Sequence, residues 1–186
     1  MKPASVLPAR ERILLRAHDL FYSHGIRATG IDRVIAESGV TKVTFYRHFP
    51  SKNDLIRAYL EYRHERWLAW FKGSIESHGA NVMALVPVFA EWFQNKEFRG
   101  CAFINTVGEL ASSLPEVGCI ARRHKEDMTA VIAGLLPESL NRDELASALA
   151  VAIDGAIVRA QYDSSENALR SLDRIISSMI REAPII

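Results

Sequence analysis

Helical periodicity is the feature that most constrains what this chain can fold into. Apolar residues recur at intervals of three and four along most of its 186 residues, and short groups of Gly, Pro and polar residues interrupt them. The first such stripe lies before Gly25 and consists of Ile13, Leu14, Ala17, Leu20 and Phe21. Strands would show strict alternation of apolar and polar residues, and no such run is present. The sequence therefore predicts an all-α protein.

Start and stop signals divide the pattern into about nine helices. Gly39 ends the second helix, and Thr41 is placed to cap the third. Ser51 with Asp54 resembles a capping box for the fourth helix. Pro87 indicates either a kink in the fifth helix or its true start. The expected ranges are 9–24, 29–39, 41–49, 51 to at least 71, 80–95, 101–112, 115–136, 141–162 and 164–182.

Charge is unevenly distributed along the chain. Residues 1–57 hold ten Lys/Arg against five Asp/Glu, a net of +5, and the remaining residues hold thirteen against seventeen, a net of −4. A polyanion partner is therefore expected to meet the N-terminal end. No apolar run approaches the ~20 residues that span a bilayer. The N-terminus also lacks the pattern of a signal peptide, so we expect a cytoplasmic protein with no membrane partner.

The stretch TKVTFYRHFPSKNDL, residues 41–55, mixes aromatic and basic residues around a proline. Two short helices joined by a glycine-containing turn, after a longer helix, make a helix-turn-helix unit, whose second short helix enters a DNA major groove. Val40, Phe45 and Phe49 can point inward. The groups left outside can donate to phosphate oxygens, and they belong to Thr41, Lys42, Thr44, Tyr46, Arg47 and His48. The alternative is a helical domain with a solvated basic surface, or a helix-turn-helix that contacts protein.

The segment TGIDRVIAESGVTKVTFYRHFPSKNDL resembles the DNA-binding half of the TetR family of bacterial transcriptional regulators. The similarity spans residues 10–57 and includes Ala-x-x-Gly-Val at 36–40 and Tyr-x-x-Phe-x-x-Lys at 46–52. It implies a homodimer with a helix-turn-helix DNA-binding domain at 1–57 and a helical effector-binding and dimerisation domain at 58–186. The implied function is a ligand-responsive regulator, most often a repressor, that binds double-stranded operator DNA.

The resemblance also implies roles for single residues. Phosphates would be held by Thr29, Lys42, Thr44, Tyr46 and Lys52. The residues nearest the bases would be Thr41, Val43 and His48. Family members usually carry a small residue, often glycine, at the position of Val43, whose methyl groups can touch a thymine methyl.

The second half of the chain has the composition of a small-molecule site. Cys101, Asn105 and Glu109 form one polar stripe at i, i+4 and i+8, and His124 interrupts an apolar stripe. An aromatic-lined cavity with a few polar groups is typical of such a site. The expected effector-binding residues are Trp67, Trp70, Phe71, Phe89, Trp92, Phe93, Phe103, Asn105, Glu109, His124 and Met128. The same aromatic stripe also suits a plain hydrophobic core, and that alternative stays open.

Two other functions compete for this half. Cys101 follows Arg99 at a helix start, which would suit a thiol-based redox sensor, but a small buried hydrophobe near a turn is the favoured interpretation of this position. An enzyme would need a nucleophile motif, metal-ligand spacing or a glycine-rich phosphate loop, and the sequence has none of these. We therefore expect no enzyme activity, no cofactor and no metal.

The last two helices, 141–162 and 164–182, are apolar on more than one face. One face can cover the core of the domain, and the second needs another partner. Two copies of the pair would form a four-helix interface, so we expect a homodimer through these helices.

Overall fold

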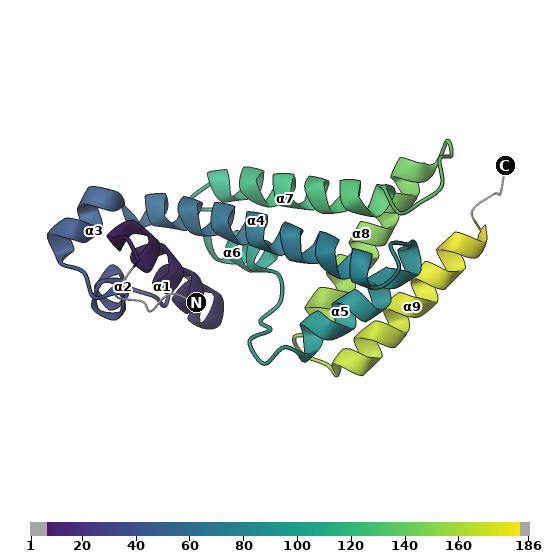
Figure 1. The fold of residues 1–186 in the computed structure, drawn as a ribbon, viewed down its shortest axis with the longest axis horizontal. Coiled ribbons are helices and arrows are strands. Elements are labelled where there is room, and N and C mark those ends of the chain that lie inside the picture. The colour runs from purple at the N-terminus through teal and green to yellow at the C-terminus, as the bar shows by residue number, and fades with distance from the viewer. Residues whose placement is uncertain (1–6, 183–186) are drawn as a thin grey trace. The chain divides into compact units, whose positions relative to one another are not determined.

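The computed structural model describes residues 7–182, and these form nine α-helices and no strand (Figure 1). The all-α prediction is confirmed. The helices are α1 Ala9–His24, α2 Ile31–Ser38, α3 Lys42–His48, α4 Lys52–Ser77, α5 Leu85–Gln94, α6 Ala102–Leu110, α7 Glu116–Ala133, α8 Arg142–Arg159 and α9 Ser165–Glu182.

The predicted helix signals act as expected. Ser51 Oγ accepts from the Asp54 N–H at 3.1 Å, which is the N-cap half of a capping box. The Asp54 carboxylate accepts from the Ser51 hydroxyl at 2.7 Å, where a full capping box would use the Ser51 backbone N–H. Pro87 lies in the first turn of α5, directly after a 3₁₀ turn at Val82–Ala84. The proline therefore marks the true start of that helix rather than a kink, because the first turn needs no N–H at that position.

The chain divides into two compact units, which we describe separately. The first unit contains residues up to Glu65 together with Ala102–Ala121, and the second contains Arg66–Cys101 and the residues from Arg122 onward. The predicted functional boundary after residue 57 stays a prediction. The packing nevertheless groups α6 with the N-terminal helices, although the sequence placed it among the effector-binding elements.

The first unit is built around α1. Helices α2 and α3 both contact it, and Phe45 of α3 is completely buried. Gly39 ends α2 with φ +63° and ψ +38°, a left-handed conformation that a side chain would strain. This turn lets α3 begin shortly afterwards, so the two short helices adopt the predicted helix-turn-helix arrangement.

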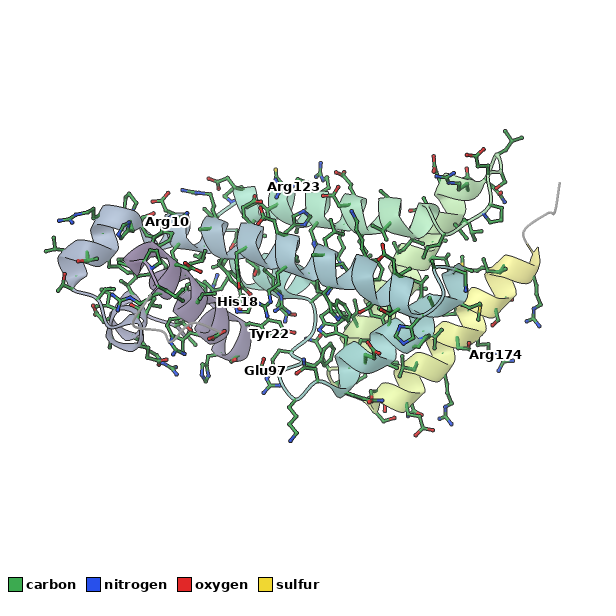
Figure 2. The ribbon with its side chains drawn as sticks, in the orientation of Figure 1. Arg10, His18, Tyr22, Glu97, Arg123 and Arg174 are labelled. Atoms are coloured by element: carbon green, nitrogen blue, oxygen red, sulfur yellow. The ribbon has the colours of Figure 1, made fainter. Side chains whose placement is uncertain are left out.

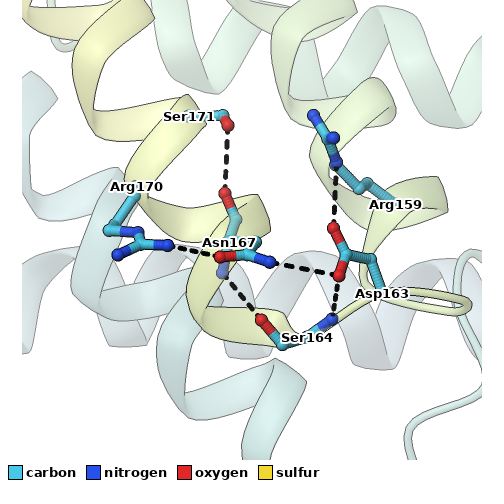
Figure 3. Close-up of polar contacts among 6 residues, drawn as sticks. All are labelled: Arg159, Asp163, Ser164, Asn167, Arg170 and Ser171. Carbon is cyan, nitrogen blue, oxygen red and sulfur yellow. Dashed lines mark hydrogen bonds and ion pairs between the residues drawn. The ribbon is translucent and has the colours of Figure 1, made fainter.

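The second unit contains α5, α8 and α9, with α9 in contact with both of the others. Figure 3 shows the turn between α8 and α9, where Asp163 accepts from the Ser164 N–H at 2.7 Å and from the Asn167 side chain at 3.2 Å. Arg159 donates to the same carboxylate at 3.3 Å. These hydrogen bonds, led by the Ser164 N–H, lower the pKa of Asp163. The turn therefore fixes the direction in which α9 returns along α8.

Among the described residues, no helix combines the length and the apolar character that crossing a membrane requires.

Candidate functional site

Helix α3 is held to the first unit by two aromatic anchors. Phe45 is fully buried and Phe49 is 2% exposed, with their rings 6.2 Å apart. Arg10 lies on α1 (Figure 2). Its guanidinium is 5.2 Å from the Phe49 ring centroid, within the range of a cation–π contact. Thr41 caps the helix as predicted, since its hydroxyl oxygen accepts from the Thr44 N–H at 3.2 Å. The anchors fix the helix so that its opposite side faces outward.

The outward side of α3 combines donors with an exposed aliphatic group. Val43 is 70% exposed and Tyr46 is 39% exposed, although both are large apolar side chains. Lys42 and Arg47 are also exposed, and Thr44 and His48 are half-buried at the edge of this face. Val43 has no partner in the core to explain it, so its methyl groups are available to an external surface. None of the predicted base- and phosphate-facing residues of α3 is buried. We call this set of residues the α3 face: Thr41, Lys42, Val43, Thr44, Tyr46, Arg47 and His48.

Thr29 lies outside the α3 face, and its side chain points into the first unit. Its side chain is completely buried, and its hydroxyl donates to the Gly25 carbonyl at 2.8 Å, with the Leu20 carbonyl 3.4 Å away. The physical reason is that a buried hydroxyl needs an acceptor, and the Gly25 carbonyl just after α1 supplies one. The phosphate contact of Thr29 stays a prediction.

Lys52 is partly buried in the first turn of α4 rather than extended into solvent. Its ammonium donates to the Ile26 carbonyl at 2.6 Å and lies 5.9 Å from the Phe21 ring. Burial lowers the pKa of Lys52, and the nearby carboxylate of Glu109 opposes that shift. In this structure the ammonium therefore interacts with the loop between α1 and α2, and its phosphate contact stays a prediction.

A dense aromatic cluster occupies the second unit. Trp67 stacks on Phe71 with ring centroids 4.8 Å apart and contacts Trp92 at 5.8 Å. Phe89 lies 5.8 Å from Phe71 and 6.0 Å from Trp92. Eight of the eleven predicted effector-binding residues belong to this unit, namely Trp67, Trp70, Phe71, Phe89, Trp92, Phe93, His124 and Met128. The sequence missed Phe98, which packs 5.1 Å from Phe93, because a single aromatic in the polar run NKEFRG gives no periodic signal.

Two polar groups are buried with these rings. His124 is 2% exposed and meets Trp67 edge-on at 4.9 Å. Trp67 is 7% exposed, and its indole N–H has no hydrogen-bond partner among the described residues. An unpaired buried donor is costly, and a bound acceptor atom would remove that cost.

The three remaining effector candidates, Phe103, Asn105 and Glu109, lie on α6 in the first unit. Phe103 is 2% exposed and meets His64 edge-on at 6.5 Å, and Asn105 is half-buried. The predicted effector contact of Glu109 stays a prediction, and in this structure the side chain has another partner. Its carboxylate accepts from the Arg27 N–H at 2.8 Å, in the loop between α1 and α2. The polar residue at this end of the α6 stripe thus contacts the loop between α1 and α2.

The last two helices leave an apolar stripe exposed. On α8 this stripe consists of Val151, Gly155 and Val158 and continues to Tyr162 just after the helix, at spacings of four, three and four. Val151 is 71% exposed and Tyr162 is 76% exposed, and Ile175 on α9 is 41% exposed. We call these five residues the α8–α9 face. A second apolar face on this pair of helices was predicted, and the structure leaves it uncovered within one chain.

The two cysteines differ in their exposure. Cys101 is 4% exposed and precedes the first residue of α6, and Cys119 is exposed on α7. Within the described residues, no group of three or more His, Cys, Asp or Glu side chains is arranged to hold a metal ion.

Residues 13–59 match the family model described as bacterial regulatory proteins of the tetR family. The HTH-type transcriptional repressor ComR of Escherichia coli is 27% identical, and the match covers 94% of this chain and 89% of that protein. The solved structure of SCO4454, a TetR-family transcriptional regulator from Streptomyces coelicolor, superposes with a TM-score of 0.83 at 28% identity. That match covers 94% of this chain and 89% of the other.

A shorter match concerns the N-terminal part alone. The HTH-type transcriptional activator FasR of Mycolicibacterium smegmatis is 39% identical over 58 residues, which is 30% of this chain. Sequence identity to this relative over 58 residues is thus higher than the identity to ComR along nearly the whole chain.

Proposed function

We propose that this chain, as a member of the TetR family of DNA-binding transcriptional regulators, is a repressor. A small, largely apolar molecule would release it from its operator. The observation that carries the proposal is the α3 face. Val43, at 70% exposure, and the neighbouring cations stand on a helix that two buried phenylalanines hold rigidly. A rigid, exposed, basic helix with an aliphatic tip suits the major groove.

On this proposal each part of the α3 face has its own role. Thr41, Val43 and His48 lie nearest the bases, and the Val43 methyl groups contact a thymine methyl. Lys42, Thr44 and Tyr46 hold phosphates and set the register of the helix on the duplex. Arg47, an exposed cation on the same face, joins them. Lys52 and the free N–H groups at the start of α4 supply a further phosphate contact.

The effector is proposed to bind in the aromatic cluster of the second unit. The aromatic rings of this cluster favour a flat apolar molecule. The few polar groups of the cluster determine which polar atoms that molecule must carry. The unpaired Trp67 N–H needs an acceptor, so the effector carries a carbonyl, carboxylate or aromatic nitrogen. His124, buried against Trp67, is the second polar contact.

A homodimer is proposed to form through the α8–α9 face. Val151, Val158, Tyr162 and Ile175 are large apolar side chains on two adjacent helices, and each is at least 40% exposed. Burying this face against its copy removes apolar surface from water and produces a four-helix interface with two-fold symmetry. Two recognition helices then read two half-sites on the DNA.

Repression is favoured over activation by one relative, since the repressor ComR aligns with nearly the whole of this chain. An effector releases the protein from DNA only if it binds the conformation that cannot bind DNA more tightly than the conformation that can. A ligand shifts an equilibrium only by its difference in affinity for the two states.

The first experiment selects bound sequences from a random duplex pool with the full chain and then measures affinity by fluorescence anisotropy at several salt concentrations. Lys42→Ala should weaken binding to all sequences and reduce the salt slope by about 1 for each phosphate that the protein no longer neutralises. Lys72→Ala is the matched control, because Lys72 is an exposed lysine of α4 in the second unit. Equal affinities for the wild type and Lys42→Ala would contradict the proposed DNA surface.

The second experiment concerns the effector. A thermal-shift screen of aromatic compounds with and without an acceptor group is followed by displacement of the selected duplex. Stabilising compounds should be those with an acceptor, and they should release the DNA. A compound that stabilises the protein without altering DNA affinity would contradict the proposed release.

A further inference from the structure

The loop between α1 and α2 is held by its own Thr29 and by side chains from two helices, α4 and α6. Helix α1 ends at His24, and Gly25 follows with φ +85°, a conformation that favours glycine. Ile26 is 2% exposed, and the buried Thr29 ties the loop to the Gly25 carbonyl. Gly30 then caps α2, so the position of this loop determines where α2 begins.

The carboxylate of Glu109 reaches this loop from α6, across 82 positions in the chain. Its Oε2 accepts from the Arg27 N–H at 2.8 Å. A Cβ built on Gly25 would lie 3.2 Å and 3.4 Å from the two carboxylate oxygens, so the carboxylate lies directly against the Gly25 backbone. Glycine is therefore required here for two reasons, its φ angle and the approach of Glu109.

Lys52 completes the arrangement from the start of α4. Its ammonium donates to the Ile26 carbonyl at 2.6 Å, one residue before the N–H that Glu109 accepts. An anion and a cation thus bind adjacent backbone groups of the same loop. Hydrogen bonds with a charged partner are stronger than those between neutral groups, so the loop has little freedom to shift.

The loop matters for DNA binding through the helices next to it. Helix α2 contacts both α1 and α3, and α3 presents the α3 face. A displacement of the loop moves the start of α2, and α3 follows because the two helices pack together with only a short glycine turn between them. Lys52, four residues after the end of α3, is released at the same time.

We infer that Glu109 is a positioning residue for DNA binding: its carboxylate holds the 25–27 loop and Lys52 so that α2 and α3 meet DNA in a fixed orientation. The inference rests on the proposed α3 face. On this inference Glu109, the last polar residue of the α6 stripe, serves the DNA-binding helices. Its hydrogen bond to the Arg27 N–H joins α6 directly to the loop that precedes α2.

The test compares Glu109→Ala, Glu109→Gln and Glu116→Ala in the full chain on the selected duplex. Glu116 is the matched control because it is an exposed carboxylate in the same unit, paired with Arg57 at 3.5 Å and not placed at the loop. Removing an anion near DNA should by itself strengthen binding. A positioning role predicts the opposite sign, with Glu109→Ala about tenfold weaker, as for the loss of one charge-assisted hydrogen bond.

Glu109→Gln keeps an oxygen that can accept from the Arg27 N–H, so it should recover most of the affinity. The Arg27 amide resonance should move in the ¹⁵N–¹H spectra of both Glu109 variants and stay unchanged in Glu116→Ala. If Glu109→Ala does not fold, the glutamine variant and its amide shift still decide the question, because an unmoved Arg27 resonance overturns the inference.

The outcomes also separate this inference from the proposed function. Reduced affinity in Lys42→Ala with wild-type affinity in Glu109→Ala overturns the role of Glu109 and leaves the α3 face standing. Wild-type affinity in both variants overturns the two together. Reduced affinity in both, with recovery in Glu109→Gln, supports both.

Discussion

Replacing Thr29 by valine tests whether its hydroxyl oxygen stabilises the fold or contacts DNA. Valine keeps the branched shape and removes the hydroxyl that donates to the Gly25 carbonyl at 2.8 Å. The site is fully buried, so water cannot replace the missing donor. Losing the hydrogen bond costs about 0.5–1.5 kcal/mol, and an unsatisfied carbonyl adds about 1–3 kcal/mol. The added apolar methyl group offsets about 0.8 kcal/mol of this.

The expected net loss is about 1–4 kcal/mol of unfolding free energy, which lowers Tm by about 2–4 °C per kcal/mol in a chain of this size. Urea unfolding followed by circular dichroism measures it, with the protomer concentration held fixed because dimerisation affects the midpoint. Well below the midpoint, the affinity of the folded variant for the selected duplex should fall far less than its stability.

Thr44→Val is the matched control because it makes the same substitution at a half-buried position on the α3 face. That variant should bind DNA more weakly and retain most of its stability. The reverse pattern, a stable Thr29→Val protein with weakened DNA binding, would refute the structural role of Thr29 and restore the predicted phosphate contact.

Three further predictions concern other parts of the molecule. Val151→Arg, at a side chain 71% exposed, should yield a folded monomer by light scattering, whereas Leu140→Arg, at an exposed position outside the α8–α9 face, should remain dimeric. Trp67→Phe removes the unpaired N–H and should weaken binding of acceptor-bearing effectors in calorimetry, with little change for purely apolar ones. Hydrogen bonds from Ser51, and then from Arg57, lower the pKa of Asp54 from 3.8. Because its pKa is lower in the folded state, Asp54 stabilises the protein above pH 3.8, and this contribution is lost as pH falls through the folded-state pKa. In Asp54→Asn, the unfolding free energy measured with urea should therefore fall less steeply as the pH is lowered.

The sequence predicted the α3 face well because each of its signals is local. Thr41 caps the helix three residues before its N–H partner Thr44, and Gly39 supplies the left-handed turn just before. The separation of Phe45 inward from Tyr46 outward follows from helical geometry alone. Local patterns fix these positions whatever the rest of the chain does.

The hydrogen-bond partners of Thr29 and Glu109 could not be predicted because they are set by tertiary packing. A threonine before a helix suits a phosphate contact and a buried loop contact equally well, and only the placement of α1 decides between them. Glu109 meets a backbone N–H 82 positions away, which no periodicity reveals. Sequence patterns show that a face is polar but not which polar group it meets.

The loop between α1 and α2 also shows how the N-terminal charge is used. The net charge of +5 over residues 1–57 suggested that its lysines and arginines face a polyanion. Lys52, however, donates to a backbone carbonyl, and burial lowers its pKa while the charge of Glu109, a carboxylate from outside that segment, opposes that shift. Arg10 packs over Phe49 and thereby supports α3 from within the first unit. The cations exposed on α3 itself are Lys42 and Arg47, so the excess positive charge divides between building the helix-turn-helix and presenting it to DNA.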